Sequence, residues 1–406
     1  MTNSTVKQES KLAVYYSFFV PLMPIFCIYA SGIPGVTMGE LLLGIFGVLA
    51  ILQRTAMNPR PRIAAILLIM NVYFLITVLM SPSNSIGLFV RIIRFMFYTF
   101  CLLYTSRKLF IYRIASKVVI TVSLLATVYV AIQYIFYFSL HTILKGQMPF
   151  LPIYFTDYLS IDYASIYSRK FFRASAFFLE PAAFSQYVIA GLVIQLFKKD
   201  TKKQMTWALV FTVGLILSTS IQGTILAAAV WCIWLLMKLL SPKNIGDMLL
   251  VLMLLFLIPL VMYLFYNSSF FDQIFSRLSG SYSAVDARFG GFSYIAELQS
   301  FHKIIGTGFG NTLEHVWMSS ASYIWYGTGL IGIIFVAIMF IKQFFNNKES
   351  ISRILCLIYA VLFLGAFLFN SYMFVFYMSF ICYVSVESLQ PKEKSVGEKQ
   401  YANLPC

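Results

Sequence analysis

Long apolar segments follow one another along almost the whole sequence, and they limit what the chain can fold into. Most run for roughly 17–25 residues, enough to cross a hydrocarbon core of about 30 Å as a helix. Only 11% of the residues are charged, whereas soluble domains have about 25%. The pattern predicts an all-α polytopic membrane protein with about twelve transmembrane helices. We place them at residues 13–30, 36–52, 63–80, 88–105, 118–139, 181–197, 205–218, 222–238, 248–265, 321–341, 353–368 and 370–386.

These helices divide the chain into seven parts. We expect two large structured extracytoplasmic loops, and within the second a short helix at 269–278 and an amphipathic helix at 284–300. In order, the parts are a cytoplasmic tail (1–12), helices one to five (13–139), the first large loop (140–180), helices six to nine (181–265), the second large loop (266–320), helices ten to twelve (321–386) and a cytoplasmic tail (387–406).

The positive charge follows this topology. The chain has a net charge of +15, and 21 of its 30 lysines and arginines lie in segments that the topology places in the cytoplasm. The short outer loops at 31–35, 81–87 and 219–221 contain no basic residue. This distribution is the positive-inside rule. It predicts that both termini are cytoplasmic, and it excludes a nucleic-acid partner.

Cysteines and histidines give no sign of a metal centre. Five of the six cysteines lie inside predicted helices, and the chain has neither a CxxC motif nor a cluster of histidine with cysteine. We therefore expect no disulfide framework, no metal site and no cofactor.

Charged residues gather where the first large loop returns to the membrane. Arg169 and Arg173 precede Glu180, and Pro181 suits the first turn of the next helix. A carboxylate at that position lies at the positive end of the helix dipole. The cluster is either a structural group of arginines and glutamate or a site for an anionic group.

Three further charges lie within predicted membrane helices. Arg91 and Arg94 share one helix face because they are three residues apart. They either reach outward to lipid headgroups or bind phosphate. Glu40 either caps the helix that begins after Pro34 and Gly35 or lines a cavity.

Each large loop carries a possible ligand-binding pattern. In the first, Tyr158 and Tyr163 accompany Asp157, a combination that suits either a sugar site or an aromatic belt at the membrane interface. In the second, Arg277, Arg288 and His315 flank a run of three glycines, Gly306, Gly308 and Gly310. Three glycines in five residues predict a tight turn where backbone can approach a ligand. Without a strand–helix context, they do not indicate a dinucleotide loop.

Together these motifs resemble the bacterial O-antigen and capsule repeat-unit polymerases, of the O-antigen polymerase and ligase superfamily. The resemblance covers residues 88–341. It rests on Arg-x-Ser-x-Phe-Phe-Leu-Glu-Pro from Arg173 to Pro181, on Arg288 at the start of an amphipathic helix, on the glycine run, and on His315 ahead of Gly329-Leu-Ile-Gly332. The ligases usually have a His-Asn pair where this chain has His315 and Val316, which favours a polymerase.

The resemblance implies a glycosyltransferase of GT-C-like architecture in the bacterial cytoplasmic membrane. Such an enzyme transfers an oligosaccharide from undecaprenyl pyrophosphate to a sugar hydroxyl of another lipid-linked unit, without metal or cofactor. A flippase and a chain-length regulator are the partners that it implies. Arg173 and Arg288 would act on the pyrophosphate, with Arg91, Arg94, Arg169 and Arg277 as further ligands, and His315 or Glu180 would serve as the base. An O-antigen ligase and a flippase or exporter of lipid-linked sugars remain as alternatives.

Overall fold

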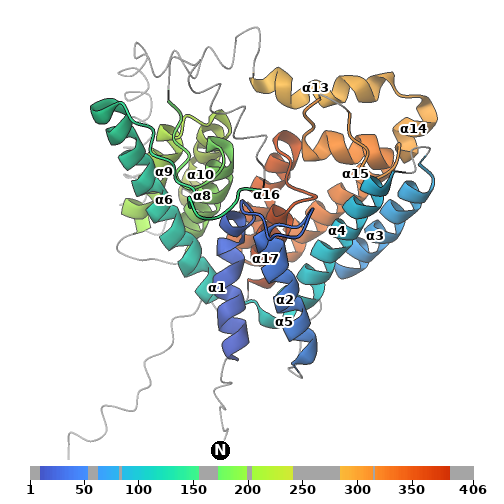
Figure 1. Ribbon diagram of the computed structural model, residues 1–406, viewed down its shortest axis with the longest axis horizontal. Coiled ribbons are helices and arrows are strands. Elements are labelled where there is room, and N and C mark those ends of the chain that lie inside the picture. The colour runs from blue at the N-terminus through green and yellow to red at the C-terminus, as the bar shows by residue number, and fades with distance from the viewer. Residues whose placement is uncertain are drawn as a thin grey trace, which may run out of the picture.

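The computed structural model describes residues 10–53, 63–81, 85–154, 172–198, 204–240, 284–313 and 316–384, with the side chains of 284–288 left out. Over these ranges the chain is helical, and its only β structure consists of two isolated bridges that tie residues 29 and 30 to 153 and 37 (Figure 1). The helices are α1 (Lys11–Phe26), α2 (Met38–Leu52), α3 (Ala64–Leu79), α4 (Ile86–Phe100), the π-helix η1 (Cys101–Ser106), α5 (Arg107–Leu109), α6 (Tyr112–Leu140), α8 (Pro181–Phe197), α9 (Gln204–Leu217), α10 (Ile221–Leu240), α13 (Ala284–Glu297), α14 (Ser300–Ile305), α15 (Ser320–Asn346), α16 (Ser350–Gly365) and α17 (Tyr372–Tyr383).

Their length and composition are those of a multi-pass membrane protein. Among the described residues, four apolar helical stretches are long enough to cross a membrane: Ile86–Leu109, α6, α10 and α15. Seven shorter apolar helices accompany them, namely α1, α2, α3, α8, α9, α16 and α17. The expected helices at 248–265 and 269–278 lie outside the described residues.

Several expected boundaries need correction. Helix α8 occupies 181–197 as predicted, because Pro181 fixes its first turn. The fifth helix was expected at 118 but begins at Tyr112, so Arg113 and Lys117 belong to its first two turns. The last helix spans Tyr372–Tyr383, shorter than the predicted 370–386. The helix expected at 284–300 is present as α13, which ends at Glu297, and a separate helix, α14, begins at Ser300.

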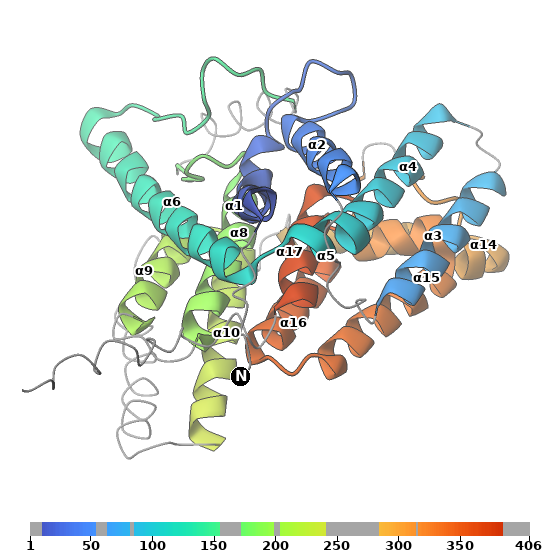
Figure 2. The ribbon, with the colours of Figure 1, turned by 90° about the horizontal axis from the view of Figure 1, so that it is seen from below.

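Helix α8 lies at the centre of one half of the bundle. It packs against α6, α9, α10 and α16, and nearly every residue from Pro181 to Leu196 is buried. Figure 2 shows α6, α8, α9 and α10 on one side of the molecule and α3, α4 and α15 on the other, with α1, α16 and α17 between them. Its contact with α16 joins α8 to the central helices.

The fourth span changes its helical geometry halfway. After α4, the six residues Cys101–Ser106 form the π-helix η1 before α5 follows. Ser106 is fully buried there, and it hydrogen-bonds the hydroxyls of Tyr16 at 2.6 Å and Ser379 at 3.0 Å. These bonds hold the wider turn against α1 and α17.

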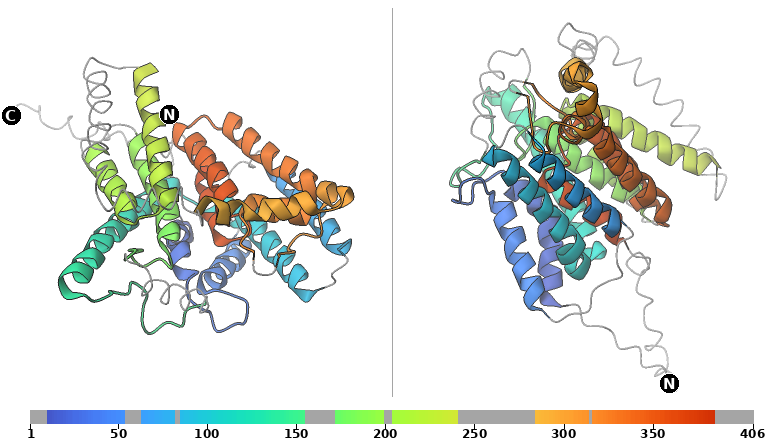
Figure 3. Two further views of the ribbon diagram at one scale, coloured as in Figure 1. Left: turned by 90° about the horizontal axis from the view of Figure 1, so that it is seen from above. Right: turned by 90° about the vertical axis from the view of Figure 1, so that its right-hand side faces the viewer.

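The glycine run connects the helix pair α13–α14 to the membrane helices. Gly306, Gly308 and Gly310 all have positive φ, of 93°, 116° and 99°. Gly308 N–H donates to the Gly327 carbonyl at 2.9 Å, where α15 has a kink at Gly329 (φ 68°). Figure 3 shows α13 and α14 lying across α15. The close backbone approach that three glycines allow is thus made to α15.

Candidate functional site

A cavity of about 350 Å³ lies where six separate stretches of the chain meet. It is lined by the N-terminus of α8, by residues of α2 and α4, by the connection between α16 and α17, by Tyr154 and by Trp317, which precedes α15. Its polar and aromatic lining includes Glu40, Arg94, Tyr154, Glu180, Trp317 and Asn370. We treat this cavity as the candidate active site.

Arg94 and Glu40 form an ion pair on the α2–α4 wall. Arg94 Nε lies 3.1 Å from Glu40 Oε1, and the two side chains are 29% and 8% exposed. Glu40 Oε1 also accepts a hydrogen bond from the Tyr98 hydroxyl at 2.5 Å. Glu40 Oε2 accepts the Thr37 N–H at 2.8 Å and the Thr37 hydroxyl at 2.9 Å, which completes a capping box at the start of α2. Both roles predicted for Glu40 are therefore present: its side chain caps α2, and it lines the cavity.

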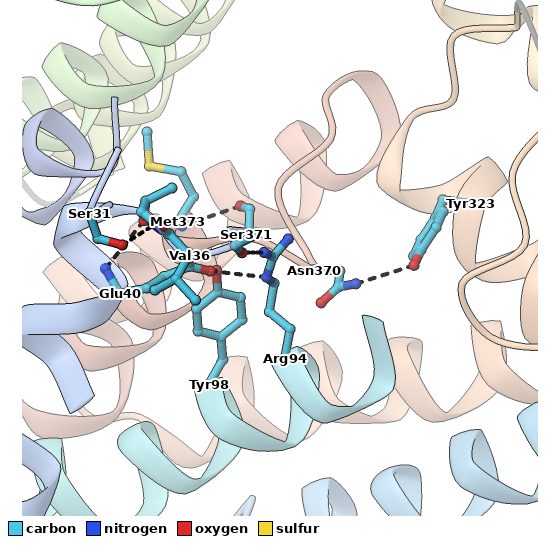
Figure 4. A network of polar contacts seen from close by, with 11 residues as sticks. Ser31, Val36, Glu40, Arg94, Tyr98, Tyr323, Asn370, Ser371 and Met373 are labelled. Carbon is cyan, nitrogen blue, oxygen red and sulfur yellow. Dashed lines mark hydrogen bonds and ion pairs between the residues drawn. The ribbon is translucent and has the colours of Figure 1, made fainter. Parts of the chain in front are cut away.

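The guanidinium of Arg94 is fixed on more than one side. Besides Glu40, it donates to the Gly35 carbonyl, and the Tyr154 side chain lies within its hydrogen-bonding reach. Figure 4 shows Arg94 between Glu40 and Tyr98 on one side and Asn370 on the other. A cation held in place and partly exposed to a cavity can bind an anionic group with little reorganisation.

Arg91 shares the α4 face with Arg94 but contacts a different segment. Its Nη1 donates to the Gly310 carbonyl and to Thr312 Oγ1, the latter at 3.2 Å. It is not among the residues that line the cavity. The two arginines thus hold two separate segments, and only Arg94 lines the cavity wall.

Glu180 brings the second carboxylate to the cavity. It is the N-cap of α8, with Pro181 as the first helical residue, and its side chain is exposed. Three residues of the first turns of α8, namely Ala182, Ala183 and Gln186, continue the same wall. A carboxylate at this end of a helix is favoured by the helix dipole.

The segment before Glu180 is held by one buried glutamine of α6. Gln133 Oε1 accepts the Ala176 N–H at 2.9 Å, and its Nε2 donates to the Leu144 carbonyl at 2.9 Å. Ala176 has a φ of 52°, in the left-handed region that non-glycine residues rarely adopt. Arg173 belongs to this segment, is half-buried, and does not line the cavity. Gln133 thus sets the path by which the chain reaches Glu180.

Several residues proposed from the sequence cannot be placed in this geometry. Arg288 belongs to α13, but its side chain is not described. Those that lie outside the described residues are Arg169, Arg277, His315, Tyr158, Tyr163 and Asp157. The turn glycines do not line the cavity: Gly306 packs on α15, Gly308 on the end of α3, and Gly310 on α4.

The cavity also contains residues that sequence reasoning did not select. Trp317, Asn370 and Gln186 come from three different segments. Only Asn370 had a visible signal, because Asn370 and Ser371 are polar residues at a tight junction between two apolar spans. The others become neighbours only through the packing of helices distant in sequence.

An apolar groove runs alongside the cavity. It has a volume of about 770 Å³ and follows α2 and α4, with apolar side chains such as Leu41, Val48 and Ile93 on its walls. Glu40 and Arg94 belong to both the groove and the cavity. The ion pair therefore lies where the apolar groove meets the cavity.

The cavity is lined by the cation of Arg94, two carboxylates, two amides and several aromatic side chains. This combination suits a ligand that has an anionic part and a polar uncharged part. Among the described residues, no group of three or more histidine, cysteine, aspartate or glutamate side chains is placed to hold a metal ion. No protein-family model and no curated protein sequence matches the chain. The residues of the cavity are therefore the basis for assigning a function.

Proposed function

We propose that the protein is a polysaccharide repeat-unit polymerase of the bacterial cytoplasmic membrane. It transfers an oligosaccharide from undecaprenyl pyrophosphate to a sugar hydroxyl of a second lipid-linked unit. In this proposal the chain crosses the membrane twelve times with both termini in the cytoplasm, and the cavity faces outward. A flippase supplies the substrate, and a chain-length regulator sets how often the reaction repeats.

The observation that carries this proposal is that Arg94 and Glu180, 86 positions apart in the sequence, line one cavity. In the reaction, the acceptor hydroxyl oxygen bonds to the anomeric carbon of the donor sugar, and the bond from that carbon to the pyrophosphate oxygen breaks. Negative charge then builds on the pyrophosphate, which a fixed guanidinium such as Arg94 stabilises. The proton of the acceptor hydroxyl passes to Glu180 as general base.

The apolar groove supports a lipid-linked substrate. A polyprenyl chain lying along α2 and α4 would bring its pyrophosphate to the end of the groove that Arg94 borders. Arg173, Arg288 and His315 belong to the proposal as further groups acting on the pyrophosphate or the acceptor, on the strength of the sequence resemblance alone.

Substitution of Glu180 tests the proposal. In the native host, deletion of the gene is expected to reduce surface polysaccharide to single repeat units on a sugar-stained gel. Wild type restores the ladder, whereas Glu180→Gln does not, because the amide cannot accept the proton. Glu349→Gln is the matched control: Glu349 is also an N-cap glutamate without a side-chain cap bond, at the start of α16. This control is expected to restore the ladder.

Other outcomes point to the alternatives. Full-length polymer that accumulates on its carrier lipid in the deletion strain would indicate a ligase. Purified wild-type protein that moves lipid-linked units across a vesicle membrane but makes no polymer would indicate a flippase. A normal ladder in the deletion strain would rule out the polymerase.

A further inference from the structure

Two amide side chains of the described residues line the cavity, and one of them has a buried acceptor oxygen without a protein donor. Asn370 is 8% exposed, and its Nδ2 donates to the Tyr323 hydroxyl at 3.2 Å. Among the described residues, Asn370 Oδ1 has no hydrogen-bond partner. A buried oxygen in this state costs free energy unless a ligand or water supplies a donor.

Gln186 contributes a second amide to the cavity, from α8. It is 7% exposed, and its Nε2 donates to Gln222 Oε1 at 3.4 Å. Within the described residues, no hydrogen bond reaches its side-chain oxygen. Both amides line the cavity, so two amide oxygens that accept no hydrogen bond from the described residues belong to one small cavity, and that of Asn370 is buried.

The position of Asn370 is set by its surroundings. The connection between α16 and α17 is tied to α15 by Ser320, whose hydroxyl accepts the N–H groups of Leu368 at 2.6 Å and Phe369 at 3.0 Å. Tyr323, which holds the Asn370 amide, is itself 1% exposed. Figure 4 shows the amide oxygen of Asn370 on the side toward Arg94 and its nitrogen toward Tyr323. The hydrogen bonds of Ser320 and Tyr323 therefore fix the position of the Asn370 side-chain oxygen.

The chemistry of a matching ligand follows from these acceptors. Ionised phosphate offers only acceptors itself, so it cannot satisfy a carbonyl oxygen, whereas a hydroxyl can. Trp317 and Phe367, each 39% exposed, add apolar ring surface to the same cavity. A sugar ring matches both features, because its hydroxyl groups can donate to these oxygens and its apolar face can lie against the aromatic rings. The cavity volume of 350 Å³ is at the small end of the roughly 300–1,000 Å³ range of ligand pockets.

We propose that this cavity holds a sugar ring of the substrate, with Asn370 and Gln186 accepting hydrogen bonds from its hydroxyls and Trp317 lying against its apolar face. The inference rests on the proposed function, and it moves the sugar contact to residues other than Tyr158, Tyr163 and Asp157. Asn370 then discriminates between a glycosylated lipid and a bare one, while Arg94 serves the phosphate part of both.

The test compares two probes with purified full-length protein in nanodiscs. One probe is the undecaprenyl-pyrophosphate-linked repeat unit extracted from the host deletion strain, and the other is undecaprenyl pyrophosphate without sugar. Affinity is taken from ligand-dependent thermal stabilisation. Asn370→Ala is expected to weaken binding of the glycosylated lipid by about tenfold or more and to leave the bare lipid within about twofold.

Tyr323→Phe is the matched control. It removes the same internal hydrogen bond but keeps the acceptor oxygen of Asn370, so it should leave both affinities within about threefold. Equal effects of Asn370→Ala on the two probes, or no effect on either, would overturn the sugar site. Wild type that binds the glycosylated lipid tenfold more tightly than the bare one but makes no polymer would refute the polymerase and uphold the sugar site.

Discussion

At the scale of single residues, the ion pair of Arg94 and Glu40 shows how one group can serve both structure and function. Glu40 accepts hydrogen bonds from Tyr98 and Thr37 as well as pairing with Arg94. An arginine that is paired on one side and 29% exposed on the other keeps donors for a ligand. Sequence reasoning selected Arg94 and Glu180 because charges are rare in this chain. It could not select Gln186 or Trp317, since amides and aromatics are common and only tertiary packing brings these two together.

Substitutions of the ion pair should separate stability from activity. Arg94→Gln or Glu40→Gln alone leaves the partner charge in a largely buried place, at a cost of roughly 3–5 kcal/mol. The double substitution should lower the free energy of unfolding by less than the sum of the two single losses. It should still abolish polymer formation, because the Arg94 cation is absent. Thermal unfolding in detergent, alongside the polymer gel, measures both effects.

The control for this pair is Arg353→Gln, because Arg353 is exposed at the start of α16. Its effect on unfolding should stay within about 0.5 kcal/mol. Additive losses in the double variant would mean that Arg94 and Glu40 are not energetically coupled.

At the scale of elements, the helices that sequence predicted best are those with a strong local signal. Pro181 marks the first residue of α8, and Glu40 caps α2, which begins at Met38, two residues after its expected start. The start of α6 was placed too late, because Arg113 and Lys117 suggested a polar segment although both are helical. The kink of α15 at Gly329 was not predicted. At this glycine the backbone of α15 lies against Ile304 and Ile305 of α14, a contact between helices that the local sequence does not reveal.

Gly329→Ala should therefore be strongly destabilising. A Cβ at this position would overlap the Ile304 carbonyl, and a φ of 68° is itself unfavourable for alanine by roughly 1–2 kcal/mol. Gly290→Ala in α13 is the matched control, since a Cβ there meets nothing within 4 Å. Thermal unfolding should show a clear loss for Gly329→Ala and no loss for Gly290→Ala. Equal melting temperatures would contradict the close contact between α14 and α15.

At the scale of the whole molecule, the exposed surface of the helices is largely apolar. Ile86, Leu52 and Phe138 are 83%, 72% and 69% exposed, which suits side chains in contact with lipid. Composition alone predicted this property, because a chain with so few charges cannot cover itself with polar surface. The cavity could not be predicted in this way, since it is assembled from α2, α4, α8 and the connection between α16 and α17.

The proposed orientation can be tested by labelling single cysteines. Thr142 is exposed just after α6, on the proposed outer side, and Lys348 is exposed between α15 and α16, on the proposed inner side. In a background without the native cysteines, a membrane-impermeant maleimide should label Thr142→Cys in intact cells. It should label Lys348→Cys only after the cells are permeabilised. The reverse labelling pattern would contradict the proposed orientation and place the cavity on the cytoplasmic side of the membrane.

The π-helix η1 determines where this span can lose a residue. Hydrogen bonds in a π turn join residues five apart, so the turn contains more residues than an α turn. Loss of one residue between Cys101 and Ser106 would be taken up by rewinding η1 as an α-helix, which leaves Arg94 and α5 close to their present relative orientation. Loss of one residue between Arg94 and Cys101 cannot be taken up in this way, because α4 is already α-helical, and it would rotate Arg94 by about 100° relative to η1 and away from Glu40.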